Sequence, residues 1–267
     1  MSDVPLWLRS LPSPVRTPEE AAAFVDQVGF CTWTALKRYD FPNLAEAVGM
    51  GEIHPYDVLD RTWLWCVCML SLDPEIYGIE GKDDLHFAKK LYYAEIFAKQ
   101  VSFMFLKLLP YLIAAQERDV FFLYDAGQLT TATKRIYEFL RENGSTPTRN
   151  LRFGTWLSGK ENESSYERAM GDLQRRFIVC KVGLRGRTRG EYGYIWDPTD
   201  AWLPELVEEA SRLERGEAKR VIGQKCEDWG LSLGPTALAY IFGWEMSEGE
   251  TPPPCNIYRP RYHPLGE

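Results

Sequence analysis

The segment RRFIVCKVGLRGRTRGEYGYIWD, residues 175–197, decides the predicted fold. Two runs rich in β-branched and aromatic residues, FIVCKVGL and YGYIW, flank a short tip that reads RGRTRG. Such runs are typical of strands, and the glycines of the tip permit a tight turn and a close approach to another molecule. The segment therefore predicts a β-hairpin whose tip carries three arginines, Arg185, Arg187 and Arg189.

Three helices are predicted immediately before this hairpin. Residues 129–144 open with threonines, carry apolar residues at helical spacing and end at a glycine, which together mark the start, the face and the end of a helix. In residues 146–157, Pro147 leads into a second short helix. Residues 162–177 predict a third helix. Its apolar stripe consists of Tyr166, Met170, Leu173 and Phe177.

This order, three helices and then a two-stranded hairpin, is that of a winged helix-turn-helix. In such a module the third helix lies in the major groove of DNA, and the hairpin tip reaches a neighbouring groove or the backbone. The predicted partner is therefore duplex DNA, bound largely through its phosphates. The expected DNA-binding residues are Arg168, Arg175, Arg176, Lys181, Arg185, Arg187 and Arg189.

The charge of the chain is unevenly distributed. The whole chain has a net charge of -7, which excludes a uniformly basic nucleic-acid coat protein. Residues 128–192 nevertheless contain thirteen Lys and Arg against seven Asp and Glu, a charge of +6, which leaves -13 for the remainder. Such a basic module suits phosphate contacts that weaken steeply with salt. The alternative is that the arginines form only a solvated tip, and that the module is an adaptor for a protein partner.

Further helical patterns outside this segment make the expected fold class mainly α with small β-hairpin wings, arranged as tandem winged-helix (helix-turn-helix) units. The first unit is expected to hold a capped helix at 17–29 and a strand pair in YYAEIF and VSFMF. The expected divisions are an extended N-terminal arm at 1–16, an N-terminal helical or winged-helix unit at 17–128, a central winged helix with a basic wing at 129–197, a C-terminal helix-turn-helix unit at 198–245 and a proline-rich tail at 246–267.

Other classes of protein are disfavoured by composition. None of the six cysteines forms a C-x-x-C pair, so we expect reduced, buried thiols in a cytoplasmic protein. The three histidines are scattered without ligand spacing, so neither a metal nor a cofactor is expected. The N-terminus lacks the apolar core of a signal peptide, and no uncharged apolar stretch of about 18 residues predicts a membrane span.

The order and spacing of these stretches resemble the AlkZ-like winged-helix DNA glycosylase superfamily, in particular its shorter AlkZ-related branch. The resemblance covers about residues 17 to 245. It implies a concave DNA-binding scaffold of tandem winged helices, and an activity that excises damaged purines in DNA repair. The stretches that carry it are TPEEAAAFVDQVGFC, KDDLHFAKKLYYAEIFAKQVSFMFLKLLPYL, AGQLTTATKRIYEFLRENG, YERAMGDLQRRFIVCKVG and LGPTALAYIFGW.

The chain departs from that family at its catalytic motif. Members carry Gln-hydrophobic-Asp or Gln-hydrophobic-Gln just after the first helix, whereas here Gln27 is followed two residues on by Gly29. The remaining candidates are Asp83, as a base that activates water, and Lys82, as a nucleophile at the sugar C1′. Acidic residues at a helix start also favour the helix dipole, which is the structural alternative. A non-catalytic winged-helix regulator is the alternative function.

Overall fold

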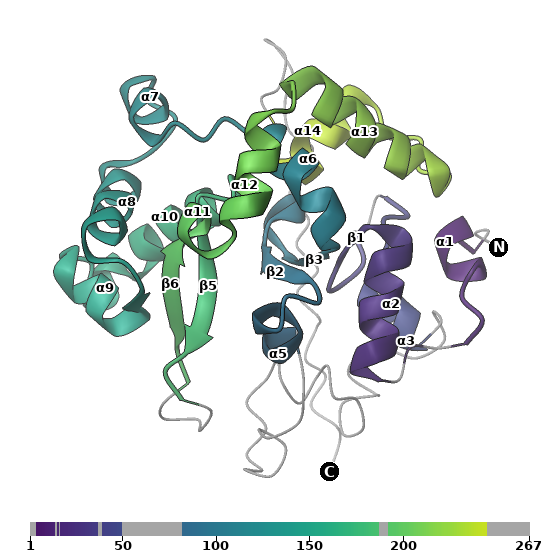
Figure 1. Cartoon of the computed structure of the whole chain (residues 1–267), viewed down its shortest axis with the longest axis horizontal. Helices are drawn as coiled ribbons and strands as arrows, with labels where there is room; N and C mark the ends of the chain where they lie inside the picture. The colour runs from purple at the N-terminus through teal and green to yellow at the C-terminus, as the bar shows by residue number, and fades with distance from the viewer. Residues whose placement is uncertain are drawn as a thin grey trace.

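The computed structural model is mostly helical and contains two small three-stranded antiparallel sheets (Figure 1). The predicted class, mainly α with small β elements, is therefore confirmed. The helix expected near residues 54–74, the arginines at 187 and 189, and the tail from 246 lie outside the described residues. The structure describes residues 4–49 except for positions 14, 16, 37 and 38, and residues 82–186 and 192–244.

The first sheet has the strand order β1 (Phe30–Thr32), β3 (Val101–Met104), β2 (Tyr92–Glu95). The expected strand pair is confirmed, with Tyr93 opposite Phe103. Helix α2 (Pro18–Val28) precedes β1 and begins with a reciprocal capping box between Thr17 and Glu20, which satisfies two backbone donors at once.

The N-terminal segment is helical where an extended arm was expected. Residues Leu6–Arg9 form the short helix α1, and Trp7 is fully buried. The Trp7 side chain contacts Phe24 of α2, and its Nε1 donates a hydrogen bond to the carbonyl of Asp40 at 2.7 Å. Burial of one large aromatic side chain is thus the interaction that holds this segment against the core.

Helix α3 (Leu44–Gly49) and helix α5 (Lys82–Phe87) come before β2, and α6 (Leu109–Ala114) follows β3. Helix α7 (Val120–Asp125) begins at Asp119, whose carboxylate accepts hydrogen bonds from two backbone N–H groups of the first turn. Helices α6 and α7 thus lead the chain from the first sheet toward the second (Figure 1).

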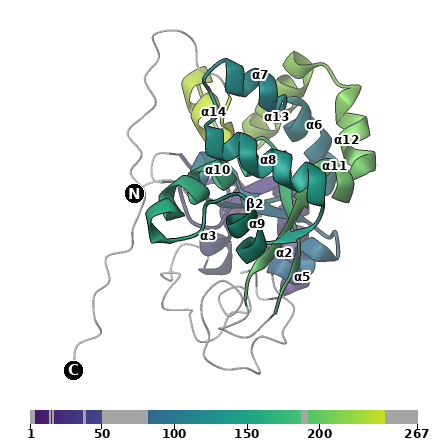
Figure 2. The same cartoon turned by 90° about the vertical axis from the view of Figure 1, so that its left-hand side faces the viewer.

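The second sheet has the order β4 (Thr146–Pro147), β6 (Tyr194–Pro198), β5 (Val179–Leu184). The expected hairpin is confirmed, because β5 and β6 pair antiparallel, with an irregularity between Lys181 and Gly183. Both sheets therefore place their three strands in the order first, third, second along the chain. In Figure 2, helices α8 and α9, which belong to the same part of the chain as this sheet, face the viewer.

All three helices predicted before the hairpin are present: α8 (Thr131–Asn143), α9 (Thr148–Gly154) and α10 (Glu163–Arg175). Thr130 caps α8, as expected. The predicted stripe of α10 is correct except at its last member. Phe177 lies beyond the helix in a left-handed conformation, with φ 54°, and this turn directs its ring into the core beside the first sheet.

The C-terminal elements are α11 (Thr199–Trp202), α12 (Pro204–Ser211), α13 (Arg215–Asp228) and α14 (Pro235–Phe242). Helix α11 packs on β5 and β6, whereas α12 and α13 pack on α6 and α14 packs on the turn between β2 and β3, so the chain returns to its N-terminal half. The ring of Phe242 lies 5.3 Å from that of Phe30 and 5.2 Å from that of Phe97. Three of the six cysteines are described, and all three are buried free thiols, as expected.

We expect the substitution Phe242→Ala to lower the free energy of unfolding by about 3–5 kcal/mol, because a fully buried aromatic ring would leave a cavity. Urea unfolding followed by circular dichroism measures this change. Phe122→Ala is the control, since Phe122 is 58% exposed, and should change stability by less than about 0.5 kcal/mol. Equal effects of the two substitutions would contradict the packing of α14 against the first sheet.

Candidate functional site

The hairpin β5–β6 and helix α9 border an open hollow of about 710 Å³. Four cationic side chains line it, and one carboxylate, that of Glu163, accompanies them. The cations are Arg149, Arg152, Lys160 and Arg185. In a chain with a net charge of -7, this hollow is a local concentration of positive charge.

The four cations come from α9, the segment after α9 and the end of β5. Arg149 and Arg152 are three residues apart and so project from one side of α9. The guanidinium of Arg152 donates to the carbonyls of Leu157 at 3.2 Å and Gly159 at 3.0 Å, so it also shapes the loop after α9. Arg149 and Lys160 are exposed.

Arg185 is the predicted DNA-binding residue that the structure brings to this hollow. It lies just after β5, it is exposed, and its backbone N–H donates to the carbonyl of Gly193 at 2.8 Å, which closes this part of the hairpin. Arg168 is also exposed, on α10, but that helix exposes Glu163 and Glu167 as well. The exposed side of the third helix is therefore less suited to phosphate contact than the hollow.

Of the other predicted DNA-binding residues that the structure describes, Arg175 and Arg176 are half-buried and Lys181 is buried. Arg176 donates to the carbonyl of Glu117 at 3.2 Å and to the side chain of Gln128. Arg175 packs against Gly243 at the end of α14, where an added Cβ would come within 3.3 Å of its Nε. These two arginines join α10 to neighbouring elements, so we exclude both from the proposed DNA contacts.

Lys181 is 2% exposed, although the sequence favoured a surface role. Its Nζ lies 3.7 Å from the ring centroid of Tyr93 and 4.6 Å from that of Tyr194. Both distances are within the range of cation–π attraction. Alternation along β5 turns this side chain toward the first sheet, which explains why its charge is not available to a ligand on the surface.

The two catalytic candidates form a buried ion pair behind the hollow. The Nζ of Lys82 lies 2.7 Å from Oδ2 of Asp83, and the two side chains are 4% and 2% exposed. The Tyr192 hydroxyl donates to Oδ2 of Asp83 at 2.7 Å, and the Tyr194 hydroxyl donates to Oδ1 at 3.2 Å. Both tyrosines also line the hollow, so the carboxylate is one side chain away from it.

In this geometry Asp83 orients neighbouring side chains, and Lys82 is its ion-pair partner. Asp83 has both oxygens engaged by side-chain donors from the hairpin, so it orients the two tyrosines. Burial raises the pKa of the Tyr194 phenol far above its usual value, so its hydroxyl remains a donor. The Nζ of Lys82 is paired with Asp83 and also donates to the hydroxyls of Tyr192 and Tyr194, so attack on C1′ would require it to leave these partners and to lose a proton.

Sequence reasoning missed both tyrosines and His86. The tyrosines were detectable in principle, because positions 192, 194 and 196 fall on one face of a strand. No pattern in the sequence around His86 indicated its role. Its Nδ1 accepts a hydrogen bond from the Tyr93 N–H at 3.1 Å, so the proton resides on Nε2, which donates to the carbonyl of Lys181 at 2.7 Å. The neutral ring thus links α5, β2 and β5.

Gln27, which stands near the place of the family's catalytic motif, is exposed and turned toward the N-terminal segment. Its Nε2 donates to Oγ of Ser10 at 3.0 Å. The buried Thr32 follows on β1, and its hydroxyl donates to the carbonyl of Thr34 at 2.8 Å. Neither side chain contacts the basic hollow or the Lys82–Asp83 pair.

A family model described as AlkZ related matches residues 80–243 of this chain. The match covers more than half of the chain, and the chain therefore belongs to the AlkZ-related family. It extends from the helix that carries Lys82 and Asp83 to the end of α14, so it includes the hollow and the ion pair. No curated protein and no solved structure matches the chain.

Two features are absent from the part of the chain that the structure describes. There, no helix has the length and apolar character required to cross a membrane. Within the same residues, no group of three or more His, Cys, Asp and Glu side chains has an arrangement that could hold a metal ion.

Protonation of His86 should destabilise the fold. Burial lowers its pKa from 6.5 to about 3. The unfolded chain therefore binds a proton that the folded chain does not between these two values, so stability is full above pH 6.5 and falls as the pH is lowered toward 3. We expect urea unfolding at pH 7 and pH 4.5 to show this loss, and His86→Gln to reduce the loss by about 2 kcal/mol. An unchanged pH dependence in the variant would contradict the neutral, buried ring.

Proposed function

We propose that this chain binds duplex DNA through a winged-helix module and acts in DNA repair. The module consists of α8, α9, α10 and the second sheet. Support comes from the order helix, strand, two helices, hairpin, which is that of a winged helix, and from membership of the AlkZ-related family. The observation that carries the proposal is the hollow with four cations beside the hairpin of an otherwise acidic chain.

We also propose a tandem arrangement of two such units, which the order of the elements supports. In the first half, α2 precedes β1, helices including α3 and α5 follow, and β2 and β3 form a hairpin. The second half repeats this order, and both sheets share the strand order first, third, second. We therefore regard the first sheet as the wing of a preceding winged-helix unit, which supports the basic module through its core.

Charge favours α9 and the hairpin as the DNA-facing elements. Cationic side chains from α9, the following loop and β5 converge on the hollow, whereas the exposed side of α10 carries two glutamates. Arginine and lysine contacts to phosphates position a protein on duplex DNA without reading its sequence. The expected binding is therefore weakly dependent on sequence and strongly dependent on salt.

Changing Arg149, Lys160 and Arg185 together to Ala should weaken duplex binding at least about tenfold in dilute salt. It should also reduce the slope of log K against log salt by up to about 3, because three phosphate contacts are lost. Fluorescence anisotropy of a labelled duplex at several salt concentrations measures both quantities.

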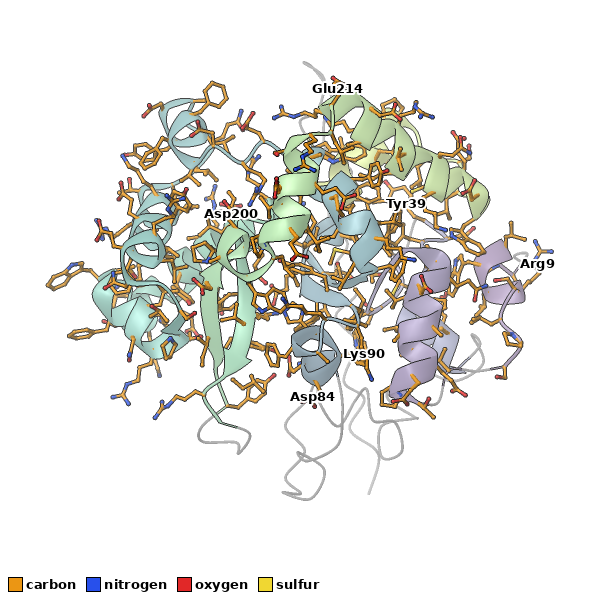
Figure 3. The ribbon with its side chains drawn as sticks, viewed as in Figure 1. Arg9, Tyr39, Asp84, Lys90, Asp200 and Glu214 are labelled. Atoms are coloured by element: carbon orange, nitrogen blue, oxygen red, sulfur yellow. The ribbon has the colours of Figure 1, made fainter. Side chains whose placement is uncertain are left out.

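A matched control removes three exposed arginines that are distant from the hollow: Arg9, Arg212 and Arg220. Figure 3 shows Arg9 on the opposite side of the molecule from the hairpin. This triple variant removes the same net charge, so long-range electrostatics are matched. If both variants lower the affinity and the slope equally, then the hollow is not the DNA-binding surface.

Base excision is the second candidate function, and the position of Asp83 favours it. The carboxylate lies directly behind two tyrosines that line the hollow. Displacement of Tyr192, which is 36% exposed, would expose a general base to a nucleotide bound there. Water activated in this way would attack the sugar C1′ and release the base, leaving an abasic site.

Asp83→Asn tests this second function on duplexes that contain alkylated purines. We expect the variant to lose detectable abasic-site formation and to bind duplex DNA within about threefold of the unaltered protein, because Asn retains the shape and accepts one hydrogen bond. Alkaline cleavage of labelled duplexes measures excision. Excision at an unchanged rate would exclude Asp83 as the base. The variant Tyr192→Phe is the control, because it removes a hydrogen bond between the hairpin and Asp83 but keeps the carboxylate.

A further inference from the structure

Helix α9 ends in two large aromatic side chains that pack against little of the fold. Phe153 is 77% exposed and Trp156 is 80% exposed. Isolated exposed apolar residues are common, but two large aromatics within one helical turn at the end of one helix form a patch. Such a patch contributes little to the folded state and becomes favourable only when a ligand covers it.

The backbone at Trp156 indicates that the fold does not require tryptophan there. The Trp156 N–H donates to the carbonyl of Phe153 at 3.1 Å, and the Leu157 N–H donates to that of Arg152 at 2.8 Å. This pair of bonds is the Schellman motif, whose left-handed residue is usually glycine. Trp156 adopts that conformation with φ 60°, so the chain carries an exposed indole where glycine would be less strained.

The aromatic patch adjoins the basic hollow. A second hollow is lined by Phe139, Arg149, Asn150, Phe153, Gly154 and Ser158. It shares Arg149 and Ser158 with the first hollow. Arg149 therefore lines one hollow with Phe153 and the other with the three other cations. Aromatic faces next to a line of cations are the combination that binds nucleic-acid strands with unstacked bases, because the rings accept bases and the cations follow the phosphates.

We infer that Phe153 and Trp156 form a stacking platform for an unpaired or unstacked base of a DNA strand whose phosphates contact Arg149 and the basic hollow. The inference rests on the proposed function and specifies its substrate: a duplex that is locally distorted rather than fully paired. The adjacent cations favour this occupant over an apolar protein surface, since they would pair with phosphates and remain unmatched at an apolar interface.

The test compares two labelled duplexes of one sequence, of which one contains a single bulged 2-aminopurine and the other is fully paired. The variant is Phe153→Ala with Trp156→Gly, and the matched control is Phe121→Ala with Phe122→Ala, an exposed pair on α7. We expect the protein to prefer the bulged duplex and to quench 2-aminopurine fluorescence. The platform variant should lose about tenfold or more of that preference, and bind the paired duplex within about threefold of the unaltered protein.

Trp156→Gly also guards against misfolding, because its melting temperature should equal or exceed that of the unaltered protein. If the platform variant keeps both the preference and the quenching while duplex binding persists, the inference is overturned and the proposed function survives. If the unaltered protein binds neither duplex, both the inference and the proposed function are overturned. If the platform variant instead dissociates a dimer seen by light scattering, the patch is an interface between two copies, and the inference is overturned.

Discussion

The structure depends on a buried polar junction between helix α5 and the hairpin β5–β6. Lys82, Asp83 and His86 project from one short helix, and all three bond to the hairpin. Burying an ion pair is costly unless its hydrogen-bonding capacity is filled, and here the hydroxyls of Tyr192 and Tyr194 bond both members of the pair. Because polar partners have directional requirements, this junction fixes the orientation of the hairpin relative to the first sheet more narrowly than apolar packing would.

The junction also connects the surface to the interior. The rings of Tyr192 and Tyr194 line the basic hollow while their hydroxyls contact Asp83. A ligand that displaces Tyr192 must therefore break a hydrogen bond to a buried carboxylate, and that carboxylate then loses one of its donors. For such a ligand, occupation of the hollow and the state of the ion pair would be thermodynamically linked.

Local signals in the sequence were sufficient for most helices, for both hairpins and for the fold class. Caps such as Thr17 and Thr130 and the terminating Gly144 act within a few residues, so they can be read from the chain. Interactions between distant segments could not be read in this way. Lys181 was predicted as a DNA contact because only its neighbours in sequence were considered, whereas Tyr93, far along the chain, determines its burial. The helical N-terminal segment was missed for the same reason, since Asp40 and Phe24 hold Trp7 in place.

Part of the positive charge of the module is not available at the surface. Residues 128–192 carry a charge of +6, yet Lys181, Arg175 and Arg176 serve the interior or the contacts between helices. Among the exposed cations that remain, Arg135 and Arg141 lie on α8 and Arg168 lies on α10, whereas Arg149, Lys160 and Arg185 line one hollow together with Arg152. A surface of few cations beside two exposed rings has limited affinity for any regular duplex, because phosphate contacts alone are few. If the proposed function holds, this surface would gain most from a strand whose bases can leave the stack, and such strands occur where DNA is damaged.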